Sequence, residues 1–208
     1  MTPDTSNLSP ASPAAPLLAN TIFLVGFMGS GKSTAGRLLA QQVAWKFVDL
    51  DALIEQEEAT TISAIFAHRG EPAFRRSEHE VLRRLIEESL RHSGQPGAGR
   101  VVALGGGTFA QQANFDLLRR AGAVTVWVEC PMDELLMRCA LMQNRPLFRD
   151  EASFRRLYEE RLPYYRQATY SVRSGRSEPA DVVKQILALP FFKGTSWIEP
   201  EHLKSPLA

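Results

Sequence analysis

The stretch TIFLVGFMGSGKST, residues 21–34, decides the fold of this chain. Its first part, Ile22–Val25, is a short and almost wholly apolar run, which is typical of a strand covered on both faces. Gly26–Ser33 then matches the full pattern G-x4-G-K-[ST], and a helical pattern follows through Val43. Glycines let the N–H groups of such a loop turn inward around phosphate oxygens, and the helix N-terminus adds partial positive charge. This order predicts a nucleotide site rather than a glycine turn without a ligand.

Further short apolar runs alternate with helical patterns, and this alternation predicts a parallel sheet with helices on both faces. The mostly helical stretch Ala52–Arg91 is expected to be interrupted near Gly70, and Pro163 is expected to kink the helix Ser153–Gln167. We therefore expect an α/β fold of the P-loop NTPase type, with a doubly wound five-stranded parallel sheet and a mobile lid. The strands expected after the first are Lys46–Leu50, Val101–Leu104, Ala123–Val128 and Tyr170–Val172.

The composition is that of an ordinary globular protein with nearly balanced charge. Lys and Arg number 24 against 23 Asp and Glu, so the bulk charge gives no reason to expect a nucleic acid or an anionic membrane as a partner. The longest apolar runs are far too short to cross a bilayer. Cys130 and Cys139 match no metal spacing and no secretory leader is evident. We expect reduced cysteines in a cytoplasmic protein, and we expect it to be a monomer.

The chain divides into one domain and two flanking segments. Residues 1–20 are dominated by Pro, Ser and Ala, and this composition predicts a disordered tail. The folded domain is expected over residues 21–189, with a polar lid at about residues 142–152. Residues 190–208 are expected to form a second tail.

Two acidic residues end the second expected strand. Ligands gather at the carboxyl ends of parallel strands, and alternate residues of an extended segment point the same way, so Asp49 and Asp51 could face one cleft. One carboxylate could then hold Mg²⁺, and the other could accept the proton of a substrate hydroxyl. The alternative is that an aspartate here caps the following helix.

A glycine triplet and three arginines are the remaining candidates. Residues 105–107, all glycine, follow the third expected strand and would let the backbone approach a ligand closely, although an isolated triplet is also typical of a flexible turn. Arg75, Arg145 and Arg161 would each, taken singly, be read as solvated side chains. Arg145 differs because it lies in the polar lid, and a lid that carries an arginine over phosphates recurs in phosphoryl transfer.

Together these motifs resemble those of one family, the shikimate kinases among the small P-loop kinases. The resemblance covers about residues 21–189 and preserves the order of the motifs. A P-loop alone is generic, whereas DxD, FRxxE, GGG, RPL and RxPxYxxA in this order are specific. The matching segments are GFMGSGKS, DLD, IFAHRGEPAFRRSE, LGGG, NRPL and ERLPYYRQA. The resemblance implies ATP as co-substrate, Mg²⁺ as cofactor and shikimate as the small-molecule substrate.

The resemblance also implies a role for each matching residue. Lys32, Asp51 and Arg145 would be catalytic, and Ser33 and Asp49 would serve Mg²⁺. The residues implied for ATP are Gly29, Ser30, Gly31, Lys32, Ser33, Thr34, Arg138 at the adenine face, and Arg145. The residues implied for shikimate are Asp51, Phe66, Phe74, Arg75, Glu78, Gly105, Gly106, Gly107 and Arg161, with Arg75 and Arg161 on its carboxylate.

The predicted function is the transfer of the γ-phosphoryl group of ATP to the 3-hydroxyl of shikimate, in the biosynthesis of aromatic amino acids. Two alternatives remain open. A gluconate-type kinase of similar architecture would also bind a carboxylate and hydroxyls. A nucleotide-binding module without catalysis would be expected to have lost Lys32, Asp51 or Arg145, and the sequence retains all three.

Overall fold

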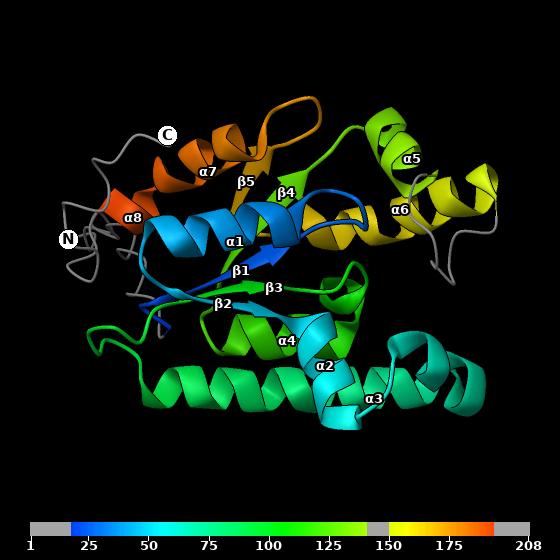
Figure 1. The fold of residues 1–208 in the computed structure, drawn as a ribbon, viewed down its shortest axis with the longest axis horizontal. Coiled ribbons are helices and arrows are strands. Elements are labelled where there is room, and N and C mark those ends of the chain that lie inside the picture. The colour runs from blue at the N-terminus through cyan, green and yellow to red at the C-terminus, as the bar shows by residue number, and fades with distance from the viewer. Residues whose placement is uncertain (1–17, 141–149, 194–208) are drawn as a thin grey trace, which may run out of the picture.

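A computed structural model describes residues 18–140 and 150–193, which form a five-stranded sheet in which every strand pair is parallel (Figure 1). The strand order is β2-β3-β1-β4-β5, so β1 is central, the chain crosses first to the edge strand β2, returns through β3, and then continues on the other side of β1 with β4 and β5. The predicted doubly wound sheet is confirmed, and each strand begins and ends within one residue of its expected bounds. The strands are β1 (Thr21–Val25), β2 (Lys46–Asp49), β3 (Arg100–Ala103), β4 (Val124–Glu129) and β5 (Tyr170–Arg173).

The central strand shows why the sheet is covered on both faces. Every residue of β1 is buried. Because alternate residues point to opposite faces, Phe23 and Val25 enter one hydrophobic core and Ile22 and Leu24 enter the other. Leu24 lies opposite Ala103 of β3, so the carboxyl ends of these two strands lie at the same edge of the sheet. Loops that follow β1 and β3 are thereby placed side by side.

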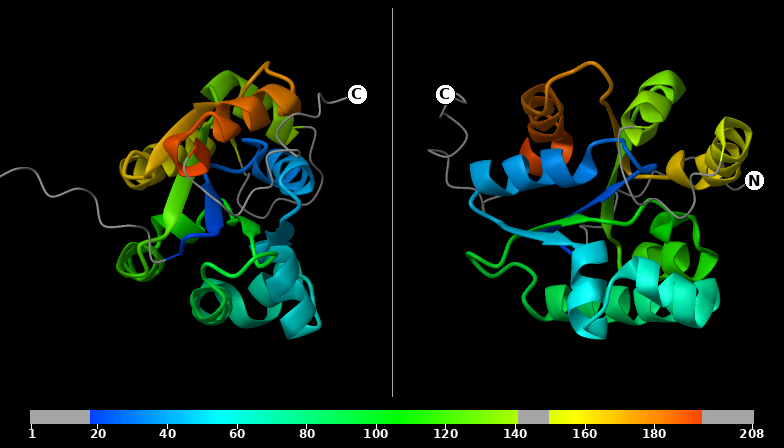
Figure 2. Two further views of the ribbon diagram at one scale, coloured as in Figure 1. Left: turned by 90° about the vertical axis from the view of Figure 1, so that its left-hand side faces the viewer. Right: turned by 45° about the vertical axis from the view of Figure 1, so that its right-hand side comes forward.

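Two layers of helices pack on the sheet (Figures 1 and 2). The helices are α1 (Lys32–Gln42), α2 (Leu50–Glu58), α3 (Ile62–Arg91), α4 (Gln112–Arg120), α5 (Met132–Ala140), α6 (Glu151–Tyr165), α7 (Pro179–Leu187) and α8 (Pro190–Lys193), with a 3-10 turn η1 (Thr108–Ala110) before α4. One core contains side chains of α1, α7 and α8, and the other contains side chains of α3, α4 and α6. Within the described part of the chain, no helix has both the length and the apolar character needed to cross a membrane.

Two helices test the sequence signals for interruption. The α3 helix is interrupted at Gly70, where φ is 75° and ψ is 170°, as the sequence predicts. The α6 helix instead continues through Pro163 and ends at Tyr165, so the proline lies in its last turn rather than dividing it. The expected extension of this helix to Gln167 is therefore wrong by two residues.

The folded domain begins earlier than the sequence predicts. Leu18 is fully buried, and the side-chain amide of Asn20 donates to the carbonyl oxygens of His92 and Gln95 in the loop after α3. These contacts correct the prediction of a disordered tail over residues 1–20, because its last three residues belong to the domain. A segment this short shows no periodicity from which its burial could be recognised.

The folded domain also ends later than predicted. Phe191 and Phe192 of α8 are buried and pack against Trp45, with ring centroids 6.2 and 5.8 Å from that of the indole. The predicted tail over residues 190–208 is therefore corrected for its first four residues, which form α8.

Replacing Leu18 by alanine is expected to lower the free energy of unfolding by about 2–5 kcal/mol, as large-to-small substitutions in a core do. Chemical denaturation monitored by circular dichroism measures this change. The matched control is Leu90→Ala, since Leu90 is an exposed leucine near the end of α3. Equal stabilities of the two variants would show that Leu18 contributes nothing to the core.

Candidate active site

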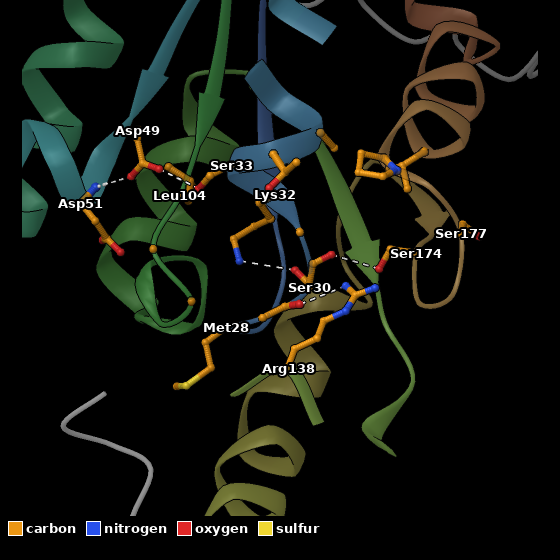
Figure 3. Close-up of a pocket in the computed structure, with 18 residues that line it drawn as sticks. Met28, Ser30, Lys32, Ser33, Asp49, Asp51, Leu104, Arg138, Ser174 and Ser177 are labelled. Carbon is orange, nitrogen blue, oxygen red and sulfur yellow. Dashed lines mark hydrogen bonds between the residues drawn. The ribbon is translucent and has the colours of Figure 1, made fainter. Parts of the chain in front are cut away.

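The loop between β1 and α1 lines a cavity of about 420 Å³ (Figure 3). Gly29 and Gly31 adopt φ values of 79° and 92°, which residues with side chains rarely adopt. The α1 helix begins directly after Gly31, and no side chain of the described residues caps its first turn. The N–H groups of this turn are therefore available to bind an anion in the cavity. The predicted phosphate-binding residues Gly29, Ser30, Gly31, Lys32, Ser33 and Thr34 all line this cavity.

The side chain of Lys32 is folded back into the loop. Its Nζ donates to the carbonyl oxygens of Gly26 and Phe27, both at 2.8 Å, and lies 3.5 Å from Ser30 Oγ. The residue is only 7% exposed. The loop therefore holds an ammonium group at the wall of the cavity, beside the place where the N–H groups would gather phosphate oxygens.

Asp49 caps a helix and also contacts the phosphate-binding loop. Its Oδ1 accepts from the backbone N–H groups of Asp51 and Ala52 at 3.1 and 3.5 Å, so Asp49 caps α2. Its Oδ2 accepts from Ser33 Oγ at 2.7 Å, which joins a carboxylate to the hydroxyl of the phosphate-binding loop (Figure 3). One aspartate therefore both starts α2 and faces the nucleotide cavity.

The pair of Ser33 and Asp49 has the chemistry of a magnesium site. Hydroxyl and carboxylate oxygens are ligands that Mg²⁺ prefers, and in nucleotide sites the ion takes few protein ligands because phosphates and waters supply the rest. The described residues contain no group of three or more His, Cys, Asp or Glu side chains that could hold a metal ion by themselves. The donor set therefore fits an ion carried by a nucleotide better than an ion enclosed by protein.

Asp51 lies where two cavities meet. A second cavity of about 90 Å³ adjoins the first, and Asp51, Met28, Gly105 and Gly106 line both. A Cβ atom at Gly105 would lie 2.4 Å from Asp51 Oδ1, so only glycine leaves room for this carboxylate. Asp51 is thereby the acidic side chain between the nucleotide cavity and its neighbour.

The second cavity brings together two arginines from distant parts of the sequence. A Cβ atom at Gly107 would lie 3.1 Å from Nη2 of Arg75 on α3 and 3.0 Å from Nη2 of Arg161 on α6. Phe66 and Phe74 line the same cavity, with ring centroids 4.9 Å apart. The two guanidinium groups therefore converge over a glycine, beside an apolar wall.

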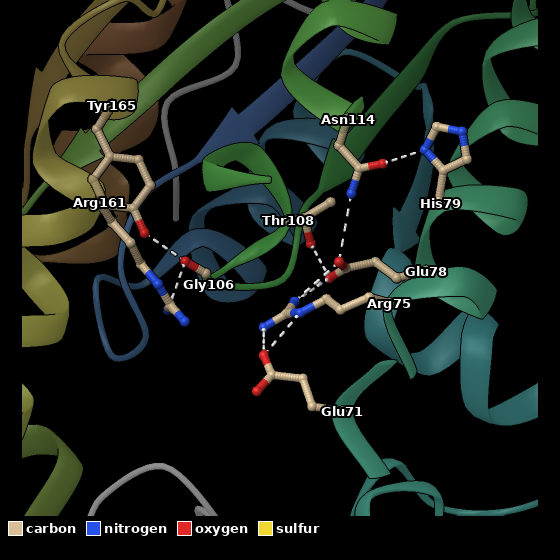
Figure 4. Close-up of polar contacts among 9 residues, drawn as sticks. All are labelled: Glu71, Arg75, Glu78, His79, Gly106, Thr108, Asn114, Arg161 and Tyr165. Carbon is tan, nitrogen blue, oxygen red and sulfur yellow. Dashed lines mark hydrogen bonds and ion pairs between the residues drawn. The ribbon is translucent and has the colours of Figure 1, made fainter. Parts of the chain in front are cut away.

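The two guanidinium groups have different partners (Figure 4). Arg75 pairs with Glu78 and Glu71, both at 3.0 Å. Burial alone would lower the pKa of Arg75, but the two carboxylates outweigh it and the net pKa is raised. Arg75 is thereby a cation whose charge is already balanced within the protein.

The positive charge of Arg161 is less well balanced than that of Arg75. Arg161 is 6% exposed, donates to the carbonyl oxygen of Gly106 at 3.1 Å, and forms no ion pair with any carboxylate of residues 18–140 and 150–193. Burial, and after it the facing charge of Arg75, lower the pKa of Arg161. A buried cation of this kind is stabilised by an anion, so the cavity is suited to a ligand with a carboxylate or phosphate.

Residues that sequence reasoning missed support this arrangement. The hydroxyl of Tyr165 donates to Gly106 O, the same oxygen that Arg161 binds, and burial raises the pKa of Tyr165, which keeps this donor protonated. Tyr165 follows Arg161 by four residues, and this helical spacing could have revealed it. Thr108 Oγ1 donates to Glu78 at 2.7 Å, and nothing in the sequence indicates that contact.

The far end of the nucleotide cavity is closed by Arg138 of α5. Its guanidinium donates to the carbonyl oxygen of Gly29 at 3.2 Å and to that of Gly175 in the loop after β5. Arg138 thus lines the cavity, away from Asp51 and in contact with the phosphate-binding loop (Figure 3). Arg145 and most of the predicted lid over residues 142–152 lie outside the described residues.

Replacing Gly107 by alanine is expected to raise the KM of the acceptor substrate by about 10-fold, the cost of weakening one charged hydrogen bond. The added Cβ would stand 3.0–3.1 Å from both guanidinium groups and would displace them. The φ of Gly107 is −108°, so alanine introduces no backbone strain. Steady-state kinetics measure the change, with the KM of ATP as the internal control. An unchanged acceptor KM would show that the two arginines do not bind the acceptor.

The fold and the site define a class of protein. The protein has the features of a small P-loop kinase. A phosphate-binding loop connects a strand to a helix, an oxygen pair is suited to Mg²⁺, and an adjoining pocket contains an acid and two arginines. The shikimate kinase family model matches residues 28–189. The chain belongs to the shikimate kinase family, and its activity is that of an ATP-dependent phosphotransferase.

Known proteins support this assignment over most of the chain. The shikimate kinase of Sulfurihydrogenibium sp. (strain YO3AOP1) is 37% identical over 167 residues, which are 80% of this chain and 95% of that protein. The shikimate kinase of Chlorobium chlorochromatii is 41% identical over 161 residues, which cover 77% and 79% of the two chains. A solved structure of the shikimate kinase from Acinetobacter baumannii in complex with shikimate superposes with a TM-score of 0.72 at 34% identity, over 81% of this chain and 90% of that one. The predicted family, enzyme class and place in aromatic amino acid biosynthesis are confirmed.

Proposed function

We propose that this protein transfers the γ-phosphoryl group of ATP to the 3-hydroxyl of shikimate, and that the second cavity is the shikimate site. The observation that carries this proposal is the convergence of Arg75 and Arg161 over Gly107, beside Asp51. Shikimate offers one carboxylate for the two guanidinium groups and ring hydroxyls for the aspartate. The relative from Acinetobacter baumannii, whose structure contains shikimate, supports this choice of ligand.

Within this proposal, each end of the acceptor has a distinct partner. Arg161 receives the carboxylate because it is the buried cation that lacks a carboxylate partner among the described residues, and Arg75 binds the same group from the opposite side. Planar guanidinium groups make paired hydrogen bonds to a carboxylate, which fixes its orientation as well as its position. This orientation places a ring hydroxyl toward Asp51, at the border with the nucleotide cavity.

The catalytic step then follows from the residues at that border. Asp51 orients the attacking hydroxyl and accepts its proton, and the Lys32 ammonium stabilises the negative charge that spreads over the transferred group. Ser33 and Asp49 are the residues that would hold Mg²⁺. When bound, this ion would neutralise charge on the phosphate oxygens. Arg138 would border adenine. That Arg145 of the lid binds the phosphates stays a prediction.

Replacing Arg75 or Arg161 by lysine tests the proposed acceptor site, because lysine keeps the charge and loses the planar fork. Each variant is expected to raise the KM of shikimate about 10- to 150-fold, the equivalent of one charged hydrogen bond at roughly 1.5–3 kcal/mol. The KM of ATP should stay nearly unchanged. The double variant should show less than the sum of both effects, because the two arginines share one carboxylate.

Two other results of these kinetics would contradict the proposal. Equal increases in the KM of ATP and the KM of shikimate would place the arginines in the nucleotide site. No effect on either substrate would return both arginines to a structural role. A matched control is Arg83→Lys, since Arg83 lies on the exposed side of α3 and pairs only with Glu80 and Glu87 among the described residues.

We further propose that the protein acts as a monomer in the cytoplasm, with neither nucleic acid nor membrane as a partner. Cys130 and Cys139 are both free and buried, which agrees with a reducing compartment. Among the described residues, Leu90 and Met137 are the large hydrophobic side chains that are exposed, and they lie on different helices. The surface formed by residues 18–140 and 150–193 therefore offers no broad apolar patch for a second copy.

A further inference from the structure

Glu78 is the centre of a buried polar cluster beside the proposed acceptor site (Figure 4). Its side chain is 1% exposed, and its two carboxylate oxygens receive hydrogen bonds from three residues. Arg75 Nη1 donates at 3.0 and 3.2 Å, Thr108 Oγ1 at 2.7 Å, and Asn114 Nδ2 at 3.4 Å. The position of the Arg75 guanidinium therefore depends on a carboxylate that is itself fixed from α4 and from the turn after β3.

Asn114 connects this cluster to a histidine outside it. Asn114 is 1% exposed, and its Oδ1 lies 2.7 Å from His79 Nδ1. An amide presents donors at one end and an acceptor at the other, and only the donor end can face a carboxylate. The amide nitrogen therefore faces Glu78 and the amide oxygen faces His79, which requires the proton of the imidazole to be on Nδ1.

Neither residue reaches the acceptor. Asn114 on α4 and His79 on α3 line neither of the two site cavities, whereas Glu78 and Arg75 line the second one. Their influence on the substrate must therefore pass through Glu78. Without the donor from His79, the amide oxygen of Asn114 would lose its hydrogen bond, and the hydrogen bond to Glu78 alone would hold the amide in place.

We propose that His79 and Asn114 are positioning residues that hold Glu78 and, through it, the guanidinium of Arg75 in the orientation that binds the acceptor carboxylate. The inference rests on the proposed shikimate site. The order of the contacts is His79 to Asn114, Asn114 to Glu78, and Glu78 to Arg75. A buried polar chain of this kind fixes one arrangement because each member leaves its neighbour a single way to be satisfied.

The test compares two substitutions of His79. His79→Leu removes the donor, and we expect it to raise the KM of shikimate about 3- to 10-fold, the equivalent of one ordinary hydrogen bond, with kcat and the KM of ATP unchanged. His79→Asn keeps an N–H donor close to the place of Nδ1 and should behave nearly as the unmodified enzyme. An equal rise in the KM of shikimate in both variants would overturn the proposal. A rise in the KM of ATP in His79→Leu would overturn it as well.

Asn114→Leu provides a second test from the other helix, and it should raise the KM of shikimate at least as much as His79→Leu. Thermal melting checks that this buried substitution still folds. If Asn114→Leu does not fold, the comparison of His79→Leu with His79→Asn decides alone, because His79 is only half-buried and its replacement should be tolerated by the fold. No change in the shikimate KM of a folded Asn114→Leu enzyme would contradict the proposal.

A double variant separates this proposal from that of the shikimate site itself. In an Arg75→Lys background, His79→Leu should add little, because the group that it positions has been replaced. Full additivity would overturn the positioning role. If Arg75→Lys alone leaves the KM of shikimate unchanged, the proposed acceptor site fails. If Arg75→Lys raises it and His79→Leu does not, only the positioning role fails.

Discussion

Replacing Lys32 by methionine is expected to lower kcat at least about 100-fold while the protein stays folded, since the loss of one preorganised charged donor costs about 10²–10³ in rate. The ammonium is held against the carbonyl oxygens of Gly26 and Phe27, so it is in place before a nucleotide binds. No solvent needs to be rearranged around it when charge spreads over the phosphoryl group. Methionine keeps the length and the packing of the side chain and removes only the charge.

Initial rates at saturating ATP and shikimate measure this effect. Lys46→Met is the matched control, because Lys46 is exposed on β2 and lies outside both site cavities. Thermal melting should give similar midpoints for the two variants. A folded Lys32→Met enzyme with a kcat close to that of Lys46→Met would remove this lysine from the mechanism.

The second large effect is expected at Asp51. Replacement by asparagine should lower kcat about 10²- to 10⁴-fold, the range that general acid–base groups contribute. The reason is that an amide can still occupy the space beside Gly105 but cannot accept the proton of the attacking hydroxyl. The fold should be unaffected, because Asp49 rather than Asp51 caps α2.

The same kinetics separate chemistry from binding. The KM of ATP should change little in Asp51→Asn, and Asp133→Asn, at an exposed site on α5, is the matched control. A kcat near that of the control would show that Asp51 neither orients nor deprotonates the acceptor. A rise in the KM of shikimate with kcat unchanged would assign Asp51 to binding alone.

Most of the fold could be predicted because its strands are short apolar runs between loops of distinct composition. Burial on both faces forces β1 to be apolar from Ile22 to Val25, and α1 and α2 begin where a glycine and an aspartate interrupt the pattern. The ends of the domain could not be predicted in the same way. Leu18, Phe191 and Phe192 are apolar residues in short segments without a hydrophobic period. Only the packed structure shows what they are buried against.

The site divides along a similar line. Asp49 ends β2, and the phosphate-binding loop and the glycine turn follow β1 and β3, so their approach to one edge of the sheet follows from the topology. Arg75 and Arg161 were paired by resemblance, and the structure places both against Gly107. Glu78 and Gly106, which hold these arginines, were implied by the same resemblance. The more distant contacts, such as that of His79 with Asn114, were missed because they arise only when α3 packs beside α4.

The most direct test of the proposed activity is the release of ADP in the presence of shikimate, of gluconate, or of neither, with the phosphorylated product identified by mass spectrometry. We expect ADP release to depend on shikimate and to match, mole for mole, the formation of a monophosphorylated shikimate carrying phosphate on the 3-hydroxyl. Gluconate should support little turnover, because we propose that the two arginines and Asp51 of the second cavity are placed for the carboxylate and a ring hydroxyl of shikimate. A higher kcat/KM for gluconate than for shikimate, or binding of ATP without turnover of either acceptor, would contradict the proposal.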